Sequence, residues 1–165
     1  MMTARLAKIA LLDAMGLYLA LVVLNNLTDY GSNYAFVAHV LAMDTTFPGN
    51  ALLWRAIHST SLYRAAYAGI IAWEALACGL MFAGGLRLWR MRGGTAAAFN
   101  GAKGLALAGL TVNLLQWLVA FVAIGGEWFL MWQSRTWNGN DTAGRMFIVG
   151  AVILLFVNQP DEDVG

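Results

Sequence analysis

The chain of 165 residues is 60% hydrophobic and only 12% charged, a composition outside the usual range of soluble domains. It is typical of a polytopic membrane protein, and a chain this short leaves no room for a separate soluble catalytic domain. The net charge of +1 provides no basic face for nucleic acid, so that class of partner is excluded. Cys78 is the single cysteine, which excludes a disulfide framework and a thiol metal cluster.

The first predicted transmembrane span covers residues 9–27. Arg5 and Lys8 precede this apolar run, as in a signal peptide, but no small residues follow at the spacing of a cleavage site. We therefore expect an uncleaved span. Asp13 is its one charged residue and lies about one helical turn inside the end that carries the two basic residues.

Residues 28–60 form a long polar and aromatic connection, in which we expect two short helices at the membrane surface. Apolar residues recur at helical spacing after Ser32, a good N-cap residue, and Asn50 is a candidate cap for a second helix ending at Ile57. A connection of this length without secondary structure would be unusual. We expect it to cover one end of the bundle.

The second predicted span covers residues 65–86 and is interrupted by Glu74. Small residues recur along it at a spacing that permits close helix approach. These are Ala65, Gly69, Ala72, Ala75 and Gly79. The following loop, from Arg87 to Lys103, holds the densest basic cluster of the chain, and the positive-inside rule places it in the cytoplasm together with the N-terminus.

The third predicted span covers residues 104–124, and a Trp-rich loop at residues 126–140 follows it on the side of the first connection. A fourth span is expected over residues 141–158, which returns the C-terminus to the cytoplasm. The pattern thus predicts an all-α membrane protein of four transmembrane helices, forming one domain over residues 1–165. We expect residues 28–60 and 126–140 together to form a folded cap on the periplasmic side.

An intramembrane polar cluster is expected around Glu74. Polar side chains within spans are costly and are functional candidates by default. At about 1.5 Å per residue, Glu74 has the same depth as Asn113 and Gln116, so we expect it to hydrogen-bond to one of them. Either a helix-packing role or a proton or ligand site fits this cluster.

Asp13, the other carboxylate within a span, is expected to form a structural pair with Arg87 or Lys103. These two basic residues belong to the loop at the same end of the bundle.

The cap holds a second set of candidate site residues. His39, Asp44, His58 and Glu127 are polar contacts for a metal ion or for a small apolar ligand such as a lipid or quinone, and Trp128 and Trp132 are candidate walls. Their spacing matches no metal motif, so hydrogen-bonded structural histidines and interface aromatics are the competing interpretations. The identity of any metal or cofactor is not specified by this pattern.

Two cap stretches and one span carry a family resemblance. The stretches are NNLTDYGSNYAFVAHVLAMDTTFPGNALLWRAI at residues 25–57, GGEWFLMWQSRTWNG at residues 125–139 and AWEALACG at residues 72–79. They resemble a bacterial family of predicted small integral membrane proteins of unknown function. The resemblance covers nearly the whole chain. It implies four spans in a bacterial inner membrane and implies no activity or catalytic residues.

Two functions are compatible with these patterns. The first is a non-enzymatic accessory or interaction protein that associates with itself or with a larger membrane complex. The second is a membrane protein that binds a metal ion or a small apolar ligand beneath its cap. Catalysis is a more distant third, because no nucleophile is paired with a base and no glycine loop binds phosphate.

Overall fold

The computed structural model describes residues 2–163, and all regular elements in this range are helices. Four helical segments are long and apolar enough to cross a membrane, and each contains one predicted span, so the predicted fold class is confirmed. They are α1 (Met2–Thr28), α3 (Thr60–Met91), a third segment of α4 (Ala96–Gly101), α5 (Gly104–Leu115) and the π-helix η2 (Gln116–Trp128), and α6 (Asn140–Asn158).

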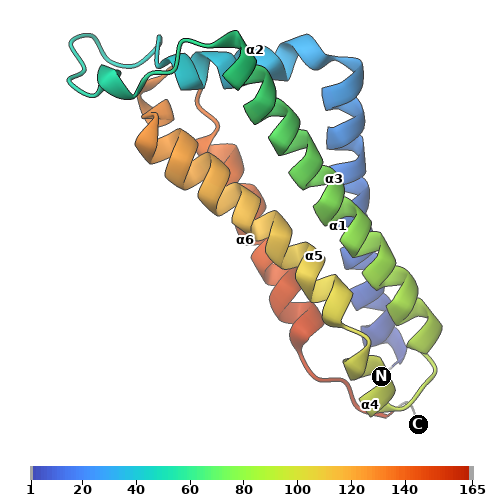
Figure 1. The fold of residues 1–165 in the computed structure, drawn as a ribbon. Coiled ribbons are helices and arrows are strands. Elements are labelled where there is room, and N and C mark those ends of the chain that lie inside the picture. The colour runs from blue at the N-terminus through green and yellow to red at the C-terminus, as the bar shows by residue number, and fades with distance from the viewer. Residues whose placement is uncertain (1, 164–165) are drawn as a thin grey trace.

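The four segments converge at the end where both termini lie and separate toward the other end, as Figure 1 shows. We call these the termini end and the cap end. In the bundle α1 packs on α3, α3 on α5 and α5 on α6. The core is apolar and includes Leu12 and Leu19 of α1, Met81 of α3, Leu110 of α5 and Val157 of α6. This packing leaves space at the cap end.

Glycines allow the close approach of α3 and α5. A Cβ atom added at Gly84 would lie 2.5 Å from the backbone nitrogen of Ala106, and one at Gly109 would lie 2.8 Å from the backbone nitrogen of Met81. Such distances are shorter than carbon atoms tolerate, so only glycine fits. The small residues that were expected to make this contact lie elsewhere on α3, as described below.

A buried polar network ties the ends of the described chain together at the termini end. Asp161 Oδ2 lies 2.6 Å from Nζ of Lys8 and 2.6 Å from Nζ of Lys103, and both ammonium groups also donate to the carbonyl oxygen of Gln159. The fully buried Arg5 donates to three backbone carbonyl oxygens. The C-terminal segment therefore supplies the counter-charge of Lys8 and Lys103 and one of the three carbonyl oxygens that bind Arg5.

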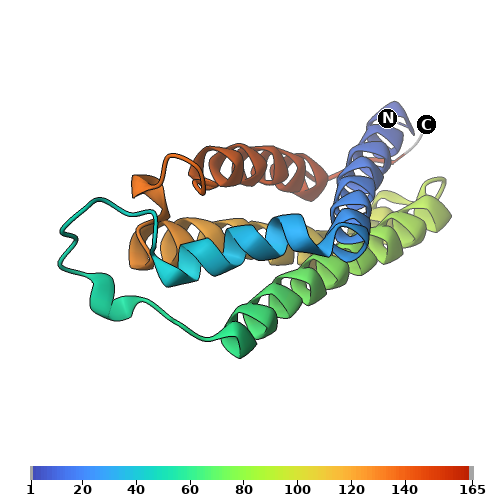
Figure 2. The ribbon, with the colours of Figure 1, turned by 90° about the horizontal axis from the view of Figure 1, so that it is seen from above.

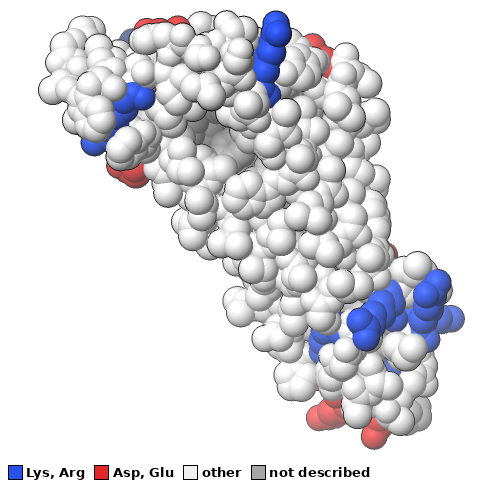
Figure 3. Space-filling view, in the orientation of Figure 1, with Lys and Arg blue, Asp and Glu red and all other residues white. Residues whose placement is uncertain are grey.

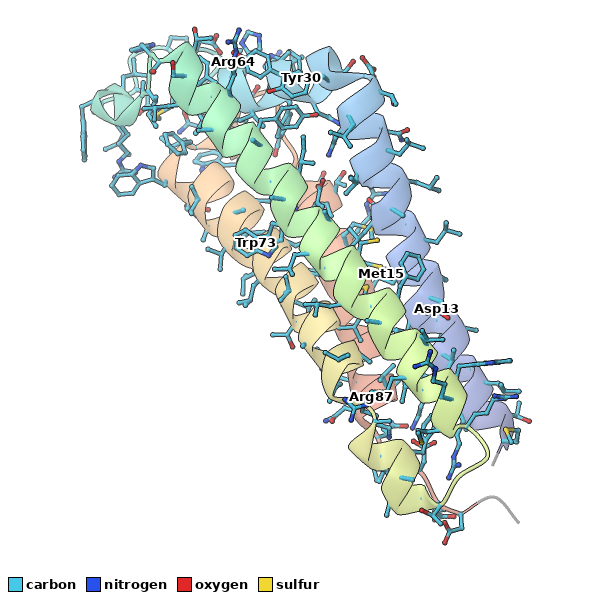
Figure 4. The ribbon with its side chains drawn as sticks, turned by 45° about the vertical axis from the view of Figure 1, so that its right-hand side comes forward. Asp13, Met15, Tyr30, Arg64, Trp73 and Arg87 are labelled. Atoms are coloured by element: carbon cyan, nitrogen blue, oxygen red, sulfur yellow. The ribbon has the colours of Figure 1, made fainter. Side chains whose placement is uncertain are left out.

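The expected pairing of Asp13 with Arg87 or Lys103 is wrong. Lys103 is held by Asp161, and Arg87 is exposed on α3. Asp13 Oδ1 is buried against Gly85 and has no hydrogen-bond partner among the described residues. Figure 4 shows Asp13 on α1 and Arg87 on α3, both in the half of the bundle nearer the termini. Of the two expected partners, one is therefore taken by Asp161 and the other points away from the bundle.

The cap is built on α2 (Tyr30–Ala42), which follows α1 after a sharp bend at Asp29. Seen from above, α2 runs in front of η2, with α3 on one side and α6 on the other (Figure 2). It begins before Ser32, whose hydroxyl donates to the Asp29 carboxylate at 2.7 Å, so the predicted N-cap is wrong by several residues. It ends at Ala42, and the next residue, Met43, is in the left-handed conformation.

The second predicted cap helix is reduced to one 3₁₀ turn, η1 (Leu53–Arg55). Asn50 does not cap a longer helix, because its Oδ1 accepts from the backbone nitrogen of Leu52 and closes a local turn instead. The loop packs on another 3₁₀ turn, η3 (Met131–Gln133), through the side chain of Gln133, which accepts from Phe47 N at 3.0 Å. The two cap segments therefore form one folded unit.

Candidate functional site

A cavity of about 400 Å³ lies beneath α2. Its walls come from α1, α2, α3, η2, the start of α6 and the loop before α6. The wall combines polar and aromatic side chains. The polar ones are Asn26, Ser32, Asn33, Tyr67, Glu74, Thr136, Asn138 and Thr142, and the other aromatic ones are Phe36, Trp117, Phe121 and Trp137. This mixture is what a pocket for an organic molecule requires.

Glu74 is the central polar group of this cavity. Its side chain is on α3 and the residue is only 3% exposed. Oε2 accepts from Asn26 Nδ2 at 2.8 Å, and Oε1 accepts from Gln116 Nε2 at 3.2 Å. Asn26 is itself held by Asn33 of α2, whose Nδ2 donates to Asn26 Oδ1 at 2.6 Å. Three helices and the π-helix thus fix the position of one carboxylate.

The amide partners of Glu74 differ in part from those expected. The depth argument allowed Asn113 or Gln116, and the structure places Gln116 against the carboxylate. Asn113 Oδ1 instead accepts from Trp117 Nε1 at 3.0 Å. Asn26 was missed, because an asparagine at the end of an apolar run was interpreted as the span boundary.

The π-helix begins at Gln116, the residue that contacts Glu74. π-Helical geometry is rare and occurs mostly as short insertions, often at functional sites. In this chain η2 extends over 13 residues, and two of them, Trp117 and Phe121, line the cavity. Gln116 is fully buried, and its Oε1 has no hydrogen-bond partner within residues 2–163.

A second, apolar cavity of about 160 Å³ adjoins the first. The two share Phe36, Val37, Ile70 and Phe121 in their walls. The apolar cavity continues between α3 and η2, where the helices separate toward the cap end. Figure 3 shows the surface hollowed there, with no charged side chain in the hollow. At this level both helices are at the cap-side ends of segments long and apolar enough to cross a membrane.

The two predicted polar contacts nearest each other are His39 and Asp44. His39 Nδ1 lies 2.8 Å from Asp44 Oδ2, and the His39 ring stacks on Trp137 with a centroid distance of 4.7 Å. The two side chains are 39% and 46% exposed, so the pair is a surface contact. Among the described residues no group of three or more His, Cys, Asp or Glu is arranged to hold a metal ion.

The other predicted cap residues lie outside both cavities. His58 and Glu127 are exposed. Trp128 packs edge-on against Trp54, and Trp132 packs against Phe47, each on the outer surface of the cap. These aromatic pairs fit the interpretation as interface residues.

The helices, the polar cap and the carboxylate cavity define a small polytopic membrane protein with a candidate site at one end of its bundle. The chain belongs to the family described as predicted small integral membrane protein (DUF2165), whose model matches residues 4–160. This confirms the resemblance found in the sequence. No curated protein and no solved structure matches the chain.

Proposed function

We propose that this protein binds a small amphiphilic molecule in the cavity beneath α2, with Glu74 as its main polar contact. The observation that carries the proposal is a cavity of about 400 Å³ with one nearly buried carboxylate in its wall. The volume is within the range of about 300–1,000 Å³ that is common for small-molecule sites. A carboxylate at this depth is costly and is a functional candidate for that reason.

A purely structural role for Glu74 explains less of the site. Hydrogen bonds to Asn26 and Gln116 would link three helices equally well in a closed, packed interface. An open space beside the carboxylate does not stabilise the fold, because the side chains around a void lose van der Waals contacts. A ligand that fills the space accounts for both the carboxylate and the cavity.

Filling the cavity tests this proposal. We expect native mass spectrometry of the protein, purified from its own membrane in a mild detergent, to show a reproducible bound small molecule. Thr142→Trp places a large ring in the cavity wall and is expected to remove that molecule. Val149→Trp, on the exposed face of the same helix, is the control and should retain it. A wild-type protein free of bound molecules in several detergents would contradict the proposal.

Association with another chain is a second candidate function, favoured by one specific observation. The small residues predicted for close helix contact on α3 are all exposed, and a Cβ atom added at Gly69 or Gly79 would meet nothing within 4 Å. This stripe is therefore unused within the chain and suits a second copy or a larger membrane complex. The same native spectra decide this candidate: a stoichiometric second subunit would support it, and a monomer alone would contradict it.

We also propose that the termini end faces the cytoplasm of a bacterial inner membrane. Six of the ten basic residues lie at that end, namely Arg5, Lys8, Arg87, Arg90, Arg92 and Lys103. A cysteine introduced by Asp163→Cys should therefore resist a membrane-impermeant thiol reagent in whole cells. One introduced at the cap by Ala51→Cys should react. The reverse labelling pattern would overturn this orientation.

A further inference from the structure

We infer that the ligand is a lipid-soluble amine, a single-chain amphiphile whose ammonium group binds Glu74 and whose tail lies between α3 and η2. This inference rests on the ligand-binding function proposed above and adds the chemical class. It follows from the charge, the free hydrogen-bonding atoms and the apolar side opening of the same site.

The cavity wall holds one carboxylate and no basic side chain. Glu74 is the only Asp, Glu, Lys or Arg among the residues that line it. Its two hydrogen-bond donors, Asn26 and Gln116, are neutral amides. Arg145, which donates to Thr142 Oγ1 at 3.2 Å, is exposed and is not part of the wall. A cation is the ligand group that completes this site, and a phosphate or carboxylate headgroup is not.

The free hydrogen-bonding atoms next to Glu74 are acceptors. Glu74 accepts one hydrogen bond on each oxygen, which leaves further lone pairs on both. The amide nitrogens of Asn26 and Gln116 both face the carboxylate and donate to it. An ammonium group supplies donors only, whereas a quinone carbonyl supplies an acceptor, so the site selects for the amine.

Burial of Glu74 during folding also lowers the desolvation cost of binding a cation. Glu74 has already been removed from water by the protein, so binding desolvates only the ammonium group. Tyr67, Trp117 and Phe121 also line the cavity, and aromatic rings attract organic cations.

The tail is assigned to the apolar cavity of about 160 Å³. Its walls between the helices are Ala66 and Ile70 on α3 and Ala120 and Ile124 on η2, all without polar side-chain atoms. The hollow in Figure 3 leads outward from this position, so an amphiphile enters from the bilayer rather than from water. The head then reaches the polar cavity past Phe121, which lines both.

The test compares three probes with the same alkyl chain: dodecylamine, dodecanol and dodecanoate. Binding is measured by tryptophan fluorescence of the protein in phosphatidylcholine nanodiscs, with empty nanodiscs subtracted. We expect the amine to bind at least about tenfold more tightly than either of the others. Glu74→Gln should abolish that preference, Glu74→Asp should retain it, and Glu127→Gln, an exposed carboxylate at the same end, should leave it unchanged.

The outcomes separate the two proposals. Equal binding of amine and alcohol, blocked in both cases by Thr142→Trp, would overturn the amine and leave the ligand-binding function standing. Tighter binding of dodecanoate would overturn the amine in the same way. Binding of no probe, together with no bound molecule in native spectra, would overturn both. Thermal unfolding of each variant shows that it is folded, and Glu74→Asp keeps the test decisive if Glu74→Gln does not fold.

Discussion

Replacement of Asp161 by Asn is expected to lower the free energy of unfolding by about 3 kcal/mol, because it leaves two buried ammonium groups without a counter-charge. Asp161 Oδ2 lies 2.6 Å from Nζ of both Lys8 and Lys103, and these side chains are at most 5% exposed. The substitution preserves shape and removes only the charge. Thermal or denaturant unfolding in detergent, followed by tryptophan fluorescence, measures the change.

The matched control is Glu162→Gln. Glu162 is the next residue, its side chain is exposed, and only its backbone carbonyl oxygen takes part in the network, by accepting from Arg5. We expect no measurable change in stability for this variant. Equal stability of the Asp161→Asn variant and the wild type would show that the network does not hold the termini end together.

The pH dependence of unfolding gives an independent measure of the same carboxylate. Burial alone would raise the pKa of Asp161, but hydrogen bonds from Lys103 and Lys8 and their charges outweigh it and hold that pKa below its ordinary value of 3.8. The unfolded chain therefore binds a proton at higher pH than the folded protein does. The stabilisation is complete above that ordinary value and is lost as the pH falls through the folded pKa. The Asn variant should lack this part of the profile.

Substitution of Gly84 by Ala is expected to destabilise the bundle by about 1–3 kcal/mol, because α3 and α5 must move apart. The added methyl group would lie 2.5 Å from Ala106 N and 2.7 Å from Ala106 Cα, both backbone atoms that cannot rotate away. The melting temperature in detergent measures this effect.

Gly79→Ala is the control for helix propensity. It is on the same helix, and an added Cβ atom would meet nothing within 4 Å. Alanine favours helix over glycine by about 1 kcal/mol, so this variant should be as stable as the wild type or slightly more stable. Melting of the Gly84→Ala variant at the wild-type temperature would contradict the close contact between α3 and α5.

The four membrane helices could be predicted because each is an apolar run of sufficient length. The depth of Glu74 relative to Gln116 could also be predicted, since depth follows from the rise per residue. The rotation of each helix about its own axis could not be predicted. The π-helix has no recognisable residue pattern, and it separates Gln116, which contacts Glu74, from Asn113, which contacts Trp117.

Contacts that join distant segments were the ones that sequence patterns missed. Asn26 is recognisable as a site residue only once α2 has folded back and brought Asn33 to it. The spacing of small residues on α3 did not locate the close approach within the chain, because Gly84 makes that contact and the predicted stripe stays exposed. The spacing of small residues shows which face of a helix could approach another helix closely, but the packing of the whole bundle determines which face does so.

The network at the termini end also constrains the order in which the protein assembles. Lys8 and Asp161 are 153 positions apart in the chain. The ribosome makes the first helix long before it makes this aspartate, so Lys8 and Arg5 enter the membrane region without their final partners. The bundle is completed at that end only after synthesis has passed residue 161, and chains that stop earlier leave three basic side chains, Arg5, Lys8 and Lys103, without the contacts that the last residues provide.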